Sequence, residues 1–123
     1  MKTVQARITK PVKVSISLDL KGKPMIKPTN ITLETAEKNE IYWKCEYEDK
    51  LVRIEILFEK QDSPFRYYSY RCAKGAGCLS GVPLAHKRRE TPYKYTLKVI
   101  QSDPRVQTGR ETVTNVAAYV TVK

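Results

Sequence analysis

Histidine is nearly missing from this sequence: His86 is its sole member, and the two methionines are Met1 and Met25. Histidine is the side chain that general acid–base catalysis uses most often, and it is also a common metal ligand. The chain also lacks a Gly-x-Ser-x-Gly elbow, a glycine-rich phosphate loop and a compact pair of carboxylates. We therefore expect that the protein is not an enzyme and that it uses no cofactor.

Long apolar runs are missing as well. No segment has the unbroken stretch of apolar residues that a secretory signal or a membrane helix requires. The three cysteines, Cys45, Cys72 and Cys78, are an odd number, which argues for reduced thiols. From these two observations we expect a cytoplasmic protein without a membrane partner.

The chain is rich in alternating apolar and polar residues. In residues 12–20 every apolar side chain falls on one face, and segments of the same kind occur at 31–33, 41–45, 52–58, 93–99 and 116–122. Turn signals such as Gly22-Lys23-Pro24 separate them, and apolar residues do not recur at helical spacing. This pattern is typical of an all-β sandwich or barrel, and we expect a β-sandwich of seven to eight strands, in one domain over residues 1–123.

Three further details follow from the same pattern. Trp43 shares a face with Ile41 and Cys45 and is predicted to occupy the centre of the core. Residues 52–58 are predicted to pair with residues 41–45 as the return arm of an antiparallel hairpin. Residues 73–89 have no period of either kind, which predicts a long loop and the place for an adaptable site.

Several short motifs resemble those of small bacterial cupredoxin-like domains of uncharacterised function. They are, in this order, Ile31-Thr32-Leu33, Ile41-Tyr42-Trp43, Ile54-Glu55-Ile56, Ser63-Pro64-Phe65, Ser80-Gly81, Tyr93-Lys94-Tyr95-Thr96-Leu97 and Asp103-Pro104. The resemblance covers roughly residues 25–123, so strands in residues 1–24 would be additional to it. It implies a Greek-key β-sandwich, cupredoxin-like or immunoglobulin-like, that is related to plastocyanin and azurin. Blue-copper sites use two histidines, a cysteine and a weak axial methionine, and residues 101–115 contain none of these, so the resemblance implies a fold and no copper site.

Positive charge dominates, with 23 Lys and Arg against 13 Asp and Glu and a formal net charge of +10. Such a balance favours approach to acidic surfaces and polyanions. Basic residues are densest beside His86, and a second segment interleaves arginine with tyrosine. Together they give the candidate binding residues, which are Arg66, Tyr67, Tyr68, Tyr70, Arg71, Lys74, Lys87, Arg88 and Arg89.

Two functions fit this basic, tyrosine-rich region. In the favoured one, the chain is a non-catalytic accessory or assembly module that binds a larger protein with an acidic surface. In the alternative, the same region binds RNA or DNA, with phosphates against the cations and bases stacked on tyrosine. Exposed strand edges also leave self-association open.

The thiols raise a third alternative. Together with His86, the residues Cys45, Cys72 and Cys78 offer three thiolates and one imidazole for zinc. Five residues separate Cys72 from Cys78, whereas about two to four are usual between paired zinc ligands. We expect free thiols at Cys72 and Cys78 in preference to zinc or a disulfide, and Cys45 as a small core residue.

Overall fold

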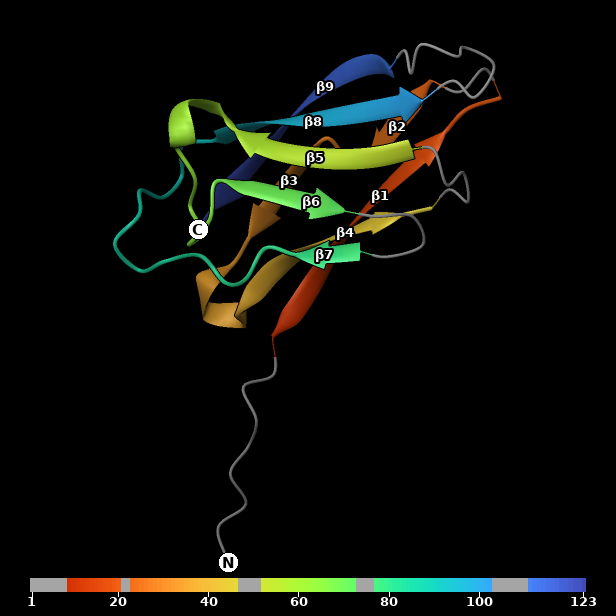
Figure 1. Ribbon diagram of the computed structural model, residues 1–123. Coiled ribbons are helices and arrows are strands. Elements are labelled where there is room, and N and C mark those ends of the chain that lie inside the picture. The colour runs from red at the N-terminus through yellow and green to blue at the C-terminus, as the bar shows by residue number, and fades with distance from the viewer. Residues whose placement is uncertain (1–8, 21–22, 47–51, 73–76, 103–110) are drawn as a thin grey trace, which may run out of the picture.

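The computed structural model describes residues 9–20, 23–46, 52–72, 77–102 and 111–123. These residues form nine strands and two short 3-10 helices, and no α-helix occurs among them. The strands make two sheets that lie face to face, with the apolar core between them (Figure 1). The prediction of an all-β, sandwich-like fold is confirmed at this level. The strand count exceeds the predicted seven to eight because some strands are too short to show alternation.

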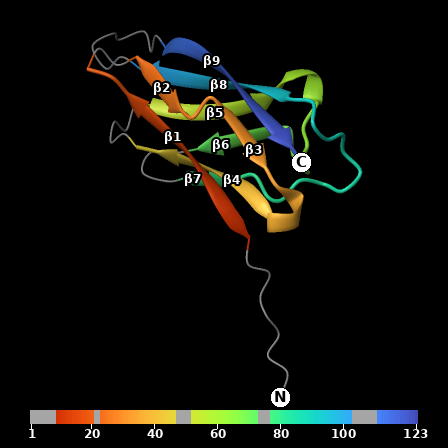
Figure 2. The same ribbon diagram turned by 180° about the vertical axis from the view of Figure 1, so that it is seen from behind.

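Both sheets contain parallel and antiparallel pairs of strands. The four-stranded sheet has the order β2 (Pro24–Lys27), β1 (Lys10–Leu18), β4 (Asn39–Cys45) and β7 (Gly77–Leu79). The five-stranded sheet has the order β3 (Asn30–Leu33), β9 (Glu111–Val122), β8 (Tyr93–Ser102), β5 (Val52–Phe58) and β6 (Ser69–Cys72). The parallel pairs are β1 with β4 and β3 with β9. Figure 2 shows β2 followed by β3 at the side of the molecule where the chain crosses from the four-stranded sheet to the five-stranded sheet.

The predicted hairpin of residues 41–45 and 52–58 is wrong. β4 pairs with β1 and β7, whereas β5 pairs with β6 and β8 in the other sheet. The two segments therefore belong to opposite layers, and their buried side chains are part of the same apolar core. Alternation shows which face of a strand is apolar, but it does not show which neighbour the strand bonds to.

The first strand lies two residues earlier in the chain than predicted, at Lys10–Leu18 in place of residues 12–20. β1 ends at Leu18, and Leu20, which the alternation placed on the buried face, is fully exposed. The backbone N–H of Asp19 donates to the Lys23 carbonyl, and the Lys23 N–H donates to the Asp19 carboxylate at 2.8 Å. This turn takes Leu20 out of the sheet before its apolar side can reach the core.

Trp43 lies in the core, as predicted, with no exposed surface. Its indole N–H donates to the Tyr95 hydroxyl at 3.3 Å, and its ring centroid is 5.1 Å from that of Tyr70. The inward alternation of residues 93–99 in β8 is also confirmed, and Cys45 is a buried core residue. The tryptophan thus contacts both sheets, because Tyr70 and Tyr95 belong to the layer opposite its own.

The two sheets are joined covalently at one side. Cys72 at the end of β6 and Cys78 in β7 form a disulfide, with their Cα atoms 5.8 Å apart. The prediction of free thiols at these positions is therefore wrong. β6 and β7 are edge strands of opposite sheets and lie side by side (Figure 1), so the fold brings together two cysteines that spacing alone left undecided.

Candidate interaction surface

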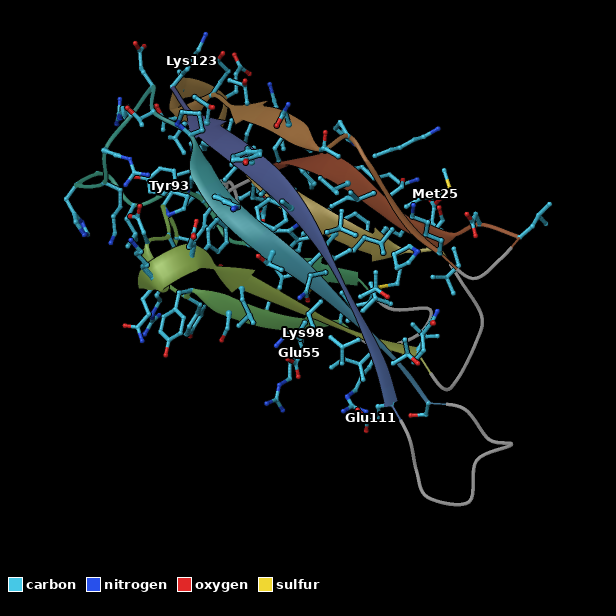
Figure 3. The ribbon with its side chains drawn as sticks, turned by 90° about the horizontal axis from the view of Figure 1, so that it is seen from above. Met25, Glu55, Tyr93, Lys98, Glu111 and Lys123 are labelled. Carbon is cyan, nitrogen blue, oxygen red and sulfur yellow. A yellow bond between two sulfur atoms is a disulfide. The ribbon has the colours of Figure 1, made fainter. Side chains whose placement is uncertain are left out.

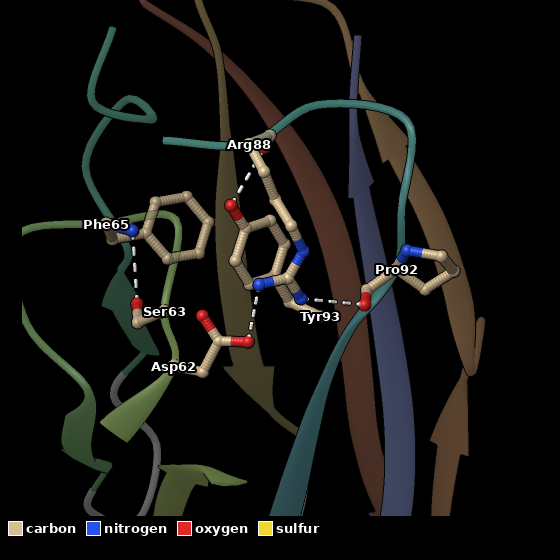
Figure 4. Close-up of polar contacts among 6 residues, drawn as sticks. All are labelled: Asp62, Ser63, Phe65, Arg88, Pro92 and Tyr93. Carbon is tan, nitrogen blue, oxygen red and sulfur yellow. Dashed lines mark hydrogen bonds and ion pairs between the residues drawn. The ribbon is translucent and has the colours of Figure 1, made fainter. Parts of the chain in front are cut away.

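A tight turn after β5 carries the exposed tyrosines. Ser63 is buried, and its hydroxyl accepts the Phe65 backbone N–H at 3.0 Å and donates to the Tyr67 carbonyl at 2.7 Å. Phe65 is buried too, edge-on to Phe58 with ring centroids 5.7 Å apart. Figure 4 shows the bond between Ser63 and Phe65. The turn is therefore held from beneath by a buried hydroxyl and a buried ring.

Tyr67 and Tyr68 follow this anchored turn and face solvent, with 57% and 47% of their surfaces exposed. The Arg66 guanidinium carbon lies 5.6 Å from the centre of the Tyr67 ring, within the range of a cation–π contact. Tyr67 also meets Tyr70 edge-on at 6.3 Å. We call Arg66, Tyr67 and Tyr68 the tyrosine surface.

Tyr70 has a different role from its two neighbours. Its hydroxyl donates to the Ser80 carbonyl at 2.8 Å, and its ring packs on Trp43. Burial, with a smaller contribution from Tyr67, raises the pKa of the Tyr70 hydroxyl above its ordinary value. Tyr70 therefore connects β6 to the segment after β7 and supports the tyrosine surface from inside.

The predicted long loop of residues 73–89 is only partly a loop. Residues 77–79 form β7, residues 73–76 and with them Lys74 lie outside the described part, and the remainder is bonded to its surroundings. Ser80 exchanges hydrogen bonds with Ile41 through its N–H and its hydroxyl, at 2.9 and 2.8 Å. The Leu84 N–H donates to the Pro64 carbonyl at 2.9 Å. This last bond places residues 81–90 beside the turn that carries the tyrosine surface.

Arg88, from the middle of the predicted basic cluster, is bonded within the fold (Figure 4). Its guanidinium donates to the Asp62 carboxylate at 2.6 Å and to the Pro92 carbonyl at 3.1 Å. It also lies over the ring of Tyr93, 3.9 Å from the ring centre. Arg88 thus fastens residues 88–92 to the turn after β5, and its charge is already matched.

The other predicted basic residues are divided between two regions. Arg89 is exposed and Lys87 is half-buried in the segment beside the tyrosine surface. Arg71 instead lies on the outer face of the five-stranded sheet, opposite Glu55 of β5. The structure therefore brings Arg66, Tyr67 and Tyr68 near the segment 84–89 but turns Arg71 away from the group.

A hollow of about 220 Å³ adjoins this region. Its lining carries both signs of charge, from Glu59, Lys60, Asp62, Arg88, Pro92 and Lys94. The sequence prediction missed Asp62 as a partner of the basic cluster, and also missed the buried Ser63. Nothing in the sequence pairs Asp62 with Arg88, which is 26 residues further along the chain.

The zinc alternative is not assembled by the described residues. Cys72 and Cys78 share a disulfide and so offer no thiolate, Cys45 is buried, and His86 is exposed in a turn. Among the described residues no group of three or more histidine, cysteine or acidic side chains is placed to hold a metal ion.

Two comparisons with known proteins found no relative of this chain. No protein-family model matches the chain, and no curated protein matches its sequence. In the part of the chain that the structure describes, no helix is both long and apolar enough to cross a membrane. We therefore infer the function of this chain from its own surface.

Proposed function

We propose that this chain is a non-catalytic accessory or assembly module that binds a larger protein through the tyrosine surface and the adjoining residues 81–90. The observation that carries the proposal is the exposure of Tyr67 and Tyr68 on a turn whose base, Ser63 and Phe65, is buried and hydrogen-bonded. Two large rings are thus presented to solvent from a rigid support.

The chemistry of this surface suits a protein partner. Tyrosine and arginine are enriched at the centres of protein interfaces and among the residues that contribute most to affinity. A support that is already ordered also lowers the entropy lost on binding. The positive charge of the chain, including exposed Arg66 and Arg89, favours a partner with an acidic surface.

Nucleic acid is the less favoured ligand for the same region. Arg88 is paired with Asp62, and Glu59 lines the neighbouring hollow, so carboxylates stand where phosphates would approach. Arg71 faces Glu55 on another part of the surface. A phosphate-binding groove instead requires unpaired cations that follow one path.

Two further expectations accompany this proposal. We propose a distant, copper-free relationship to cupredoxin-like domains with Greek-key connections, which the two-sheet arrangement and the buried Trp43 support. We also propose a cytoplasmic location, although the disulfide between Cys72 and Cys78 removes two of the three thiols from which it was argued. The redox state of Cys72 and Cys78 in cells tests the location, because cytosolic thiols are held reduced. A disulfide that persists in intact cells would contradict it.

Affinity capture from native cells at low and high salt tests the function. We expect a stoichiometric protein that stays bound at high salt and is lost from the Tyr67→Ser/Tyr68→Ser variant. A Lys87→Glu/Arg89→Glu variant, which leaves the structural Arg88 in place, should capture less of that protein, because both substitutions put a carboxylate against its acidic surface. Nucleic acid that is captured instead, released by salt and lost from the Lys87→Glu/Arg89→Glu variant, would overturn the proposal in favour of RNA or DNA binding.

A further inference from the structure

The outer face of the four-stranded sheet carries a lysine cluster far in sequence from the tyrosine surface. In the register, Ser15 of β1 lies opposite Lys27 of β2 on one side and Lys44 of β4 on the other. Lys13 lies on the same face of β1, and all three lysines are exposed. Neighbouring strands are about 4.8 Å apart, so Lys27 and Lys44 flank the serine across roughly 10 Å of flat sheet.

A carboxylate of the chain already occupies part of this cluster. Glu46 Oε1 lies 2.8 Å from Lys13 Nζ. The hydrogen bond from Lys13 is the largest of the effects that lower the pKa of Glu46, and the charge of Lys44 and the hydroxyl of Ser15 act in the same direction. The face therefore binds a carboxylate through Lys13, while Lys27, on the far side of Ser15, forms no ion pair with a described residue.

The outer face of the five-stranded sheet differs in its charge. Arg53 contacts Glu111 at 2.9 Å, and Lys94 lies 4.0 Å from Glu59. In the register Glu55 lies opposite Lys98, and Figure 3 shows these two side chains next to each other. Glu55 thus lies between Lys98 and Arg71 in the register of that face, whereas an uncharged residue, Ser15, lies between Lys27 and Lys44 on the four-stranded sheet.

Apolar side chains border the lysines. The ring of Tyr42 lies against the backbone of β7, because a Cβ added at Gly77 would come within 2.1 Å of Tyr42 Cε1. Leu79 is directly opposite Tyr42 and is 53% exposed. At the other side of the sheet Met25 of β2 points outward, as Figure 3 shows. The face therefore offers aliphatic contacts on both sides of its charges.

We propose that this face, formed by Lys13, Lys27, Tyr42, Lys44 and Leu79, docks an extended acidic segment of a partner protein. The charges and the seated carboxylate match aspartate or glutamate side chains, and Leu79 matches an apolar residue between them. A nucleic acid fits less well, because the face has lysines in place of arginines. This surface is separate from the tyrosine surface, so either proposal can fail alone.

Fluorescence anisotropy with a short labelled peptide of glutamates and interspersed leucines tests this proposal on the full chain. Lys27→Gln/Lys44→Gln should weaken binding by about tenfold, since two exposed charge contacts are lost. The matched control Lys94→Gln/Lys98→Gln has the same net charge and should bind within about twofold of the unmodified chain. Equal losses in both variants, or no binding by the unmodified chain, would overturn the proposal.

Three additional measurements separate the remaining outcomes. Leu79→Ser should weaken binding of the leucine-containing peptide and leave binding of an all-glutamate peptide unchanged. The Tyr67→Ser/Tyr68→Ser variant should bind both peptides as the unmodified chain does, and a loss there would move the site to the tyrosine surface and contradict the proposal. Tighter binding of a single-stranded oligonucleotide than of either peptide at the same salt concentration would also contradict it.

Discussion

Arg88 lies over the ring of Tyr93, with its guanidinium carbon 3.9 Å from the ring centre, while the Tyr93 hydroxyl donates to the Arg88 carbonyl at 2.8 Å. The two residues thus bind each other through both side chain and backbone (Figure 4). Together with the ion pair to Asp62, this contact makes an arginine from the most basic stretch of the sequence a structural residue. The residues left for binding are then the exposed ones beside it.

Replacing Arg88 should therefore affect stability. Arg88→Ala removes the contact with Tyr93 and the ion pair with Asp62, and because the side chain is partly exposed we expect a loss of about 1 kcal/mol in the free energy of unfolding. Urea denaturation measures it. Arg89→Ala, the matched control, should stay within about 0.5 kcal/mol of the unmodified chain. Equal effects of the two substitutions would show that the contact with Tyr93 contributes nothing.

Stability should decline in alkali because of Tyr95. Burial raises the pKa of Tyr95 to about 12, from about 10 in an unfolded chain. Below about pH 10 the Tyr95 hydroxyl is protonated in both the folded and the unfolded chain, so its contribution to the free energy of unfolding is fully present. Above that pH the unfolded chain loses this proton first, so the free energy of unfolding falls, by up to about 3 kcal/mol near pH 12. Urea denaturation at several pH values should give a shallower decline for Tyr95→Phe. Identical slopes would contradict this assignment.

The disulfide should contribute about 2 kcal/mol, because Cys72 and Cys78 close a short loop that restricts the unfolded chain. Adding reductant should lower the thermal midpoint of the unmodified protein. The Cys72→Ala/Cys78→Ala variant should unfold at the same temperature with and without reductant. If reductant left the thermal midpoint of the unmodified protein unchanged, the disulfide would contribute nothing to its stability.

Gly77 should tolerate no side chain. A Cβ there would lie 2.1 Å from Tyr42 Cε1 and 2.7 Å from the Trp43 carbonyl oxygen, so we expect Gly77→Ala to cost about 1–3 kcal/mol by denaturant unfolding. Adding Tyr42→Ser should restore part of this loss, because the carbonyl contact remains. Gly81→Ala meets no atom within 4 Å and costs only the strain of a φ of +79°, about 1 kcal/mol. A harmless Gly77→Ala would show that Tyr42 does not lie across β7.

Much of the fold could be predicted from alternation alone. The inward faces of β5 and β8 and the burial of Trp43 follow from the pattern of apolar residues. Strand partners could not be predicted in this way, because the backbone bonds that join β4 to β1 leave no trace in side-chain polarity. The β1 boundary was misplaced because Leu20 continues the alternation into a turn.

The candidate site was predicted in composition and only partly in arrangement. Tyr67 and Tyr68 are exposed as a binding surface requires, but Tyr70 and Arg88 of the same prediction hold the fold together. Their partners, Ser80 and Asp62, are distant in sequence, so only the folded chain pairs them. The lysine cluster around Ser15 was missed for a similar reason, since its members come from three strands.

The central claim is that a protein partner docks on the tyrosine surface, and photo-crosslinking in native cells tests it most directly. A photoreactive phenylalanine would replace Tyr68 in one variant and Tyr119, an exposed tyrosine on β9, in a matched control. The account predicts one discrete protein adduct from position 68 that is missing from position 119. Adducts with nucleic acid at position 68, or the same protein adducts from both positions, would contradict it.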